Sequence, residues 1–319
     1  MTSEQLTYLV FGVVLLIALV FDLGLLSKKT TEITIKKALV QTIFWVSLAL
    51  AFFVFIWFED GKTIAIEYLS AYLMEWSLSI DNIFVFILIF SFFKVKQQFI
   101  PRALLIGILM AIIFRIIFIS VGIVLIERFE WLLYFFGAFL LYTGVKMFTA
   151  KHDEEVNLAE NKVYRFIQRM LPIVSHDGDG KFSIVQDGKR FYTNLFVVII
   201  MLATTDIVFA LDSIPAVFAI SQNRLVIYTS NIFAVLGLRS LFFLLKGAVN
   251  KFAYLQQGIA VVLVFIGLKM LAEMVHFKVP VFVSLLVIVL CITASIIYSI
   301  STAGRAGKTE LQQGESDLR

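Results

Sequence analysis

Apolar runs of about 20 residues recur along the whole of this 319-residue sequence. A run of about 20 residues spans the roughly 30 Å hydrocarbon core of a bilayer as an α-helix, and a helix satisfies its own backbone hydrogen bonds in lipid. The sequence therefore predicts an all-α polytopic membrane protein with about nine transmembrane helices. The nine predicted spans are 6–26, 38–58, 64–93, 101–126, 131–149, 193–220, 225–245, 253–274 and 280–301.

The composition excludes a soluble globular domain. Hydrophobic residues make up 60% of the sequence and charged residues 16%, against about 45–50% and about 25% in soluble domains. The net charge of +4 would suggest nucleic acid as a partner of a soluble protein, but here basic residues flank membrane spans. We expect a lipid bilayer and no nucleic acid as the partner. The single cysteine, Cys291, excludes a disulfide framework and a cysteine metal site.

The distribution of basic residues predicts the orientation of the spans. Lysine and arginine gather after spans one, three, seven and nine, whereas the alternate loops are short and poorer in basic residues. Because cytoplasmic loops carry the excess of lysine and arginine, the N-terminus is expected outside and the C-terminus inside.

The predicted organisation has six parts. They are two peripheral spans (1–63), a first three-helix unit (64–149), a cytoplasmic loop (150–192), a second three-helix unit (193–274), a last span (275–301) and a polar cytoplasmic tail (302–319), expected to be disordered. Within the loop, residues 157–171 have a helical period and end before a proline. Residues 182–192 are typical of a small hairpin that turns at Asp187-Gly188.

Two acids lie inside apolar runs at matching places. Asp81 belongs to the stretch SIDNIF (79–84) and Asp212 to ALDSIP (210–215), and each follows a second acid by six residues, Glu75 and Asp206. A buried carboxylate costs several kcal/mol unless it is paired, protonated or bound to a cation. We interpret Asp81 and Asp212 as core cation ligands; the alternative is a structural hydrogen bond or ion pair between helices.

The earlier acid of each pair cannot share one face of a straight helix with the later acid. Six residues correspond to about 9 Å along a helix and about 120° around it. Either the helix is broken between the acids, or Glu75 and Asp206 form an outer part of the ion path. Asn82 and Ser213 directly follow the later acids and offer neutral oxygens as further candidate ligands. Pro215 is expected to free the carbonyl of Leu211, which would be one more oxygen beside a carboxylate.

Spans three to five and six to eight form an internal repeat. Arg115 in span four corresponds to Arg239 in span seven, and the segment TGVKM (143–147) corresponds to IGLKM (266–270). Each copy has three helices, which is an odd number, and one cytoplasmic loop joins the two copies. The copies must therefore lie in opposite orientations in the membrane. This is the inverted-repeat plan of secondary transporters, whose sites lie near the midplane where the copies meet.

The charges of the repeat suggest the ligand. Four acids and two arginines leave a net charge of −2, which one divalent cation would neutralise, and an empty site should take up protons. Plain pairing of the arginines with the acids is the alternative role for Arg115 and Arg239. Oxygen donors favour Mn²⁺, Mg²⁺ or Ca²⁺ over copper or zinc. Asp22, near the inner end of span one, could lie at a cytoplasmic entrance.

The chain resembles the TerC family of integral membrane proteins. The blocks that carry the resemblance are 75–85, 136–147, 206–218 and 230–239. The resemblance is closest to the alkali-induced branch, which implies export of manganese from the bacterial cytoplasm across the inner (cell) membrane. It places the family's intramembrane acids on Glu75, Asp81, Asp206 and Asp212, with polar neighbours Asn82, Ser213 and Asn231. The chain departs from related sequences at Ala203, where a glutamate is frequent.

Two other classes of function stay open at the level of sequence. One is a membrane scaffold that assists the folding or metalation of other membrane or exported proteins, with loop 150–192 as its docking surface; the broader family also implies tellurite-resistance complexes. The other is an intramembrane enzyme, for example a hydrolase, which we do not expect because no histidine stands near the acids in sequence to activate a serine as a nucleophile. The sequence does not determine the oligomeric state.

Overall fold

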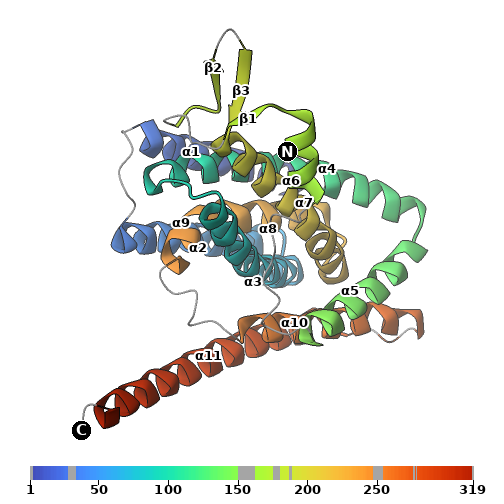
Figure 1. The fold of residues 1–319 in the computed structure, drawn as a ribbon. Coiled ribbons are helices and arrows are strands. Elements are labelled where there is room, and N and C mark those ends of the chain that lie inside the picture. The colour runs from blue at the N-terminus through green and yellow to red at the C-terminus, as the bar shows by residue number, and fades with distance from the viewer. Residues whose placement is uncertain are drawn as a thin grey trace.

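Helices make up nearly all of the computed structural model (Figure 1), which describes residues 3–27, 34–149, 162–174, 180–186, 189–246, 254–275, 277 and 279–317. The helices of the bundle are α1 (Ser3–Ser27), α2 (Ile35–Glu59), α3 (Lys62–Phe92), α4 (Ile100–Arg128), α5 (Trp131–Thr149), α7 (Asn194–Ile220), α8 (Arg224–Leu236), α9 (Leu238–Leu245), α10 (Leu255–Ala272) and α11 (Val281–Asp317). Short helical turns, η1 (Gln97–Phe99) and η5 (Glu273–Val275), precede α4 and follow α10.

Seven helical segments of the described chain are long and apolar enough to cross a membrane. They are 35–59, 97–128, 131–149, 194–220, 224–245, 255–272 and 282–299, and each coincides with a predicted span. At the two other predicted positions the structure has α1, of 25 residues, and α3, of 31 residues. The prediction of an all-helical multi-pass protein is confirmed.

Large apolar side chains cover the outside of the helix bundle. Ile113, Ile117 and Val121 of α4 are each at least half exposed, as is Leu290 of α11. Such a surface would be an aggregation hazard in water, whereas lipid tails are as apolar as these side chains. The outward faces of these helices are therefore suited to contact with a bilayer.

The segment formed by α8 and α9 is the most deeply buried of the membrane-crossing candidates. It packs against α2, α3 and α4, and α8 also contacts α1. An aromatic cluster joins four of these helices: the Phe52 ring lies 5.8 Å from Phe11, 5.5 Å from Tyr68 and 5.1 Å from Phe233, measured between centroids. The two N-terminal helices thus cover the middle of the second predicted repeat.

Glycines bring α5 and α10 into close contact. A Cβ added at Gly267 would lie 2.7 Å from the Gly137 carbonyl oxygen, and one added at Gly144 would lie 2.9 Å from the Ala260 carbonyl oxygen. Small residues at such spacing let the backbones of membrane helices approach closely. Each of the two segments singled out by the predicted repeat, TGVKM and IGLKM, therefore contributes one glycine to the seam between α5 and α10.

Local sequence signals set several helix ends. The Asn223 side chain accepts a hydrogen bond from the Leu225 amide at the start of α8 (2.9 Å), as an N-cap does. Pro101 stands in the first turn of α4, where the missing N–H costs nothing. Helix α3 ends at Phe92, and Lys94, two residues later, lies in the left-handed region at φ 48°.

The loop between the two predicted repeats is ordered over its described part. Helix α6 (Lys162–Met170) precedes a small sheet of order β1-β3-β2, formed by Ile173–Val174, Ser183–Gln186 and Lys189–Thr193. Strands β2 and β3 pair antiparallel, which confirms the predicted hairpin, and they project from one end of the bundle in Figure 1. The predicted turn residues 187–188 and the start of the predicted helix, residues 157–161, lie outside the described residues.

The structure decides one open alternative about helix continuity and corrects two expectations. Helix α3 runs unbroken from Lys62 to Phe92, and α7 continues through Pro215 to Ile220, so neither helix is broken between its two acids. The seventh predicted span is instead interrupted at Gly237, between α8 and α9, where glycine is a poor helix former. The tail expected to be disordered continues α11 as a helix to Asp317; its Lys, Glu, Leu and Gln residues are good helix formers.

Candidate functional site

The Arg115 side chain joins four helices at one guanidinium. Its Nε and Nη2 donate to the two carboxylate oxygens of Asp206, both at 3.0 Å, and its Nη1 donates to Glu75 and, at 3.2 Å, to Asn231 Oδ1. These residues come from α4, α7, α3 and α8 respectively. The two-pronged contact with Asp206 uses the planar fork that distinguishes arginine from lysine.

All four members of this cluster are withdrawn from the surface. Relative exposure is 0% for Glu75 and Asn231, 1% for Asp206 and 2% for Arg115. The Asn231 amide is itself held in place, because its Nδ2 donates to the Ile227 carbonyl one helical turn earlier at 3.0 Å. The cluster is therefore a fixed polar core within an apolar bundle, where charge interactions are screened little.

The charges of the cluster do not cancel. Two carboxylates face one guanidinium, so the ionised cluster carries −1, and Glu75 Oε2 has no hydrogen-bond partner among the described residues. An uncompensated buried charge is costly, because removal of a partner from such a site destabilises a protein by about 3–5 kcal/mol. A proton or a bound cation would remove the imbalance.

Hydroxyl groups lie near the cluster in sequence and are also buried. Ser79 and Ser213 are 0% and 1% exposed, and neither hydroxyl has a hydrogen-bond partner within the part of the chain that the structure describes. Asn82, which follows the first core acid, is buried as well. Buried polar atoms without partners are rare and call for an explanation such as an ion or a water.

The structure brings together some of the predicted site residues and leaves others undescribed. Glu75, Asp206, Arg115 and Asn231 form one cluster. Asp81 and Asp212 lie within α3 and α7, six residues beyond the acids of the cluster, but their side chains, like that of Asp22 in α1, are outside the described set. Among the described side chains, which do not include these three acids, no group of three or more His, Cys, Asp or Glu residues is placed to hold a metal ion.

Two supporting residues of the predicted site differ in burial. Arg239 in α9 is buried at 5% exposure. The Leu211 side chain is 53% exposed on α7. The pairing of an arginine with the acids, left open by the sequence, is thus found for Arg115.

Lys269 has a structural role that its sequence position concealed. A lysine near a span end is expected to extend toward the membrane surface, but Lys269 is only 6% exposed and its Nζ donates to the Ala219 carbonyl at 3.0 Å. Ala219 lies in the last turn of α7, where carbonyls lack helical partners and a cation is favoured. Lys146, which is the counterpart of Lys269 in the predicted repeat, is exposed.

A polar contact near the start of α3 was missed by sequence reasoning. The Ser221 hydroxyl, at the end of α7, donates to Glu67 Oε2 at 2.5 Å, although 154 residues separate the two in sequence. Glu67 falls inside the third predicted span, and an acid within an apolar span is the signal that could have revealed it.

The fold and the site together define a multi-pass helical membrane protein with a buried carboxylate–arginine cluster. Residues 60–306 match the profile of the integral membrane protein TerC family, so the chain belongs to this family and the predicted resemblance is confirmed.

Relatives match over most of their length. An uncharacterized membrane protein of Myxococcus xanthus is 43% identical over 88% of both chains, and one of Rickettsia felis is 38% identical over 92% of this chain and 97% of its own. A protein of Escherichia coli named "Putative membrane-bound redox modulator Alx" is 39% identical over 86% of this chain and 88% of its own. No solved structure matches.

Proposed function

We propose that this protein exports a divalent metal cation, Mn²⁺ first among the candidates, from the bacterial cytoplasm across the inner membrane in exchange for protons. The observation that carries the proposal is the buried cluster of Glu75, Asp206 and Arg115, with its uncancelled charge of −1 and a Glu75 oxygen that has no partner in the described chain. Acids inside membrane spans mark ion pathways and proton relays.

The cation would pass along α3 and α7, which pack against each other. Asp81 and Asp212 are the proposed core ligands, about 9 Å further along each helix than the acids of the cluster. Asn82 and Ser213, both buried, would add neutral oxygens. These donors suit Mn²⁺, Mg²⁺ or Ca²⁺, and the alkali-induced branch favours Mn²⁺ among the three. Asp22 would lie at the cytoplasmic entrance.

We infer an inverted repeat of α3–α5 and α7–α10, with nine spans. Its support is reciprocal packing: α3 packs on α8 as α7 packs on α4, and α5 and α10 pack on each other. The glycine contacts are reciprocal too, because Gly267 approaches Gly137 and their repeat partners, Gly144 and Ala260, approach each other. Such repeats alternate access around a site at their junction.

Polar links between helix ends agree with the alternation of ends that the proposed nine-span topology requires. Thr7 donates to Asp60 at 2.7 Å, and both belong to ends predicted outside. Arg102 donates to the Gly180 carbonyl at 3.2 Å, and both belong to segments predicted inside. Each link therefore joins two residues that the proposal places on the same side of the membrane.

The test is flux of radiolabelled Mn²⁺ in proteoliposomes, with Mg²⁺, Ca²⁺ and Zn²⁺ as competitors and an imposed pH gradient. Asp81→Asn and Asp212→Asn should each abolish flux while the protein still inserts. Glu127→Gln, an acid that is 53% exposed near the end of α4, is the matched control and should transport normally. Wild-type flux in either aspartate variant would overturn the assignment.

A membrane scaffold that assists folding or metalation of other proteins is the second candidate. Its support is the ordered surface of the loop, where Phe166, Met170 and Val185 are each more than 60% exposed. Deleting most of loop 150–192 should abolish scaffolding and leave flux intact. The name of the Alx relatives suggests a redox role. This sequence has a single cysteine, Cys291, and so offers no cysteine pair for thiol–disulfide exchange within the chain.

A further inference from the structure

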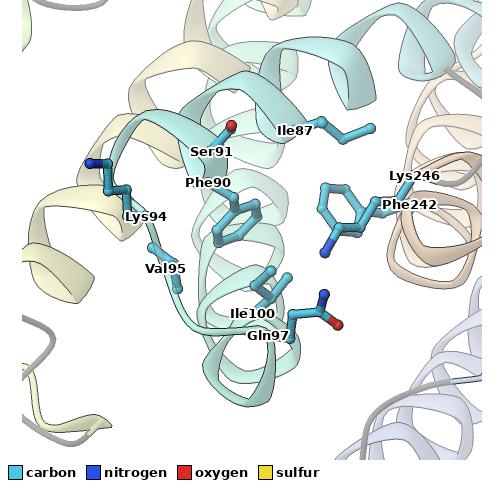
Figure 2. A pocket seen from close by; sticks show the side chains of 9 residues that line it. All are labelled: Ile87, Phe90, Ser91, Lys94, Val95, Gln97, Ile100, Phe242 and Lys246. Atoms are coloured by element: carbon cyan, nitrogen blue, oxygen red, sulfur yellow. The ribbon is translucent and has the colours of Figure 1, made fainter. Parts of the chain in front are cut away.

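A cavity of about 390 Å³ lies between the end of α3, the start of α4 and the end of α9 (Figure 2). Apolar side chains form its walls: the Phe90 and Phe242 rings meet edge to face, with centroids 5.4 Å apart, and Ile87 and Ile100 complete the walls. The remaining lining residues are Ser91, Lys94, Val95, Gln97 and Lys246. The cavity thus joins an apolar interior to a polar rim.

The rim of the cavity is positively charged. Lys94 and Lys246 are both among the nine lining residues, and none of the nine is acidic. Figure 2 shows the Lys246 side chain reaching from the α9 side toward Ile100 and Gln97, while Lys94 lies on the opposite rim with its ammonium turned outward. The lysine stem is flexible enough to swing a point charge toward a ligand.

The backbone at Lys94 supports a role for its side chain. Lys94 N–H donates to the Ser91 carbonyl at 3.0 Å and Val95 N–H to the Phe90 carbonyl at 3.1 Å, the two bonds of a Schellman motif. The residue after the helix cap in this motif is usually glycine, because left-handed φ penalises a Cβ. Here a lysine occupies the position at φ 48°. A charged side chain therefore stands where glycine would be less strained.

We propose that this cavity binds the phosphate headgroup of an anionic phospholipid from the cytoplasmic leaflet, with an acyl chain against Phe90 and Phe242. Both lysines belong to helix ends that the proposed orientation places inside, and the choice of leaflet rests on that orientation. Basic pockets between membrane helices on the cytoplasmic side suit such headgroups. An anionic amphiphile matches both the charge of the rim and the apolar walls.

The experiment is a titration of the purified full chain with phosphatidylglycerol, followed by native mass spectrometry. Lys246→Gln should weaken the first binding event about fivefold, the effect of one lysine near an anionic surface. The double variant with Lys94→Gln should weaken it about 25-fold if the two charges act independently. Lys96→Gln is the matched control, because Lys96 lies two residues away and does not line the cavity; it should bind as the wild type does.

Three results would overturn the inference. They are unchanged binding in Lys246→Gln, equal binding of phosphatidylcholine with the same acyl chains, and displacement of the lipid by inorganic phosphate at equal concentration, which would indicate a site for a soluble anion. Mn²⁺ flux is measured separately on the same preparations. Loss of flux in Asp81→Asn with phosphatidylglycerol binding retained would show that lipid binding is independent of the transport site.

Discussion

Replacement of Arg115 by glutamine gives the sharpest test of the buried cluster. The substitution removes hydrogen bonds to Asp206, Glu75 and Asn231 and changes the charge of the ionised cluster from −1 to −2. Every member is at most 2% exposed, so solvent screens the change little. Breaking a buried pair in this way costs about 3–5 kcal/mol, a large part of the 5–15 kcal/mol that typically holds a domain folded.

Glu75→Gln is the informative counterpart to Arg115→Gln. It cancels the excess charge and keeps the two-pronged contact between Arg115 and Asp206. Its stability should stay within about 1 kcal/mol of the wild type, since a neutral hydrogen bond replaces a charged one. If the excess charge serves to attract a cation, this variant nevertheless loses Mn²⁺ flux.

The assay is unfolding in mixed micelles by increasing dodecyl sulfate, followed by circular dichroism, on variants purified at equal yield. Arg224→Gln is the control, because Arg224 pairs with Glu127 at more than 50% exposure of both side chains, and such surface pairs contribute about 0–1 kcal/mol. Equal stability of Arg115→Gln and Arg224→Gln, with full flux in Glu75→Gln, would refute the reasoning.

Two further predictions concern packing. Gly267→Ala should destabilise the protein by about 1–3 kcal/mol, because its Cβ would lie 2.7 Å from the backbone of α5. Gly12→Ala is the control and should leave stability unchanged, because an added Cβ there would meet nothing within 4 Å. Equal unfolding midpoints for the two variants would contradict the close packing of α5 on α10. Lys269→Met should lower stability by about 1–2 kcal/mol by uncapping the end of α7. The same change at exposed Lys146 should have little effect. A larger loss of stability in Lys146→Met than in Lys269→Met would show that the capping bond is unimportant.

The sequence alone determined the membrane class, the positions of the helices and the hairpin in the loop. Length and hydropathy suffice for this, because a bilayer leaves a spanning backbone almost no alternative to a helix. The duplicated acids and Arg115 could also be recognised from the sequence, since a charge inside an apolar run is rare.

Only the tertiary structure decided which of these charges meet. The acids and arginines occupy equivalent positions in the two predicted repeat units, yet the guanidinium of Arg115 pairs with one acid from each unit, Glu75 and Asp206. Asn231 contributes to the same guanidinium from a helix 116 residues away. Spacing along one helix gives the rotation between two side chains but not the partner that another helix presents to them, because that depends on how the helices cross.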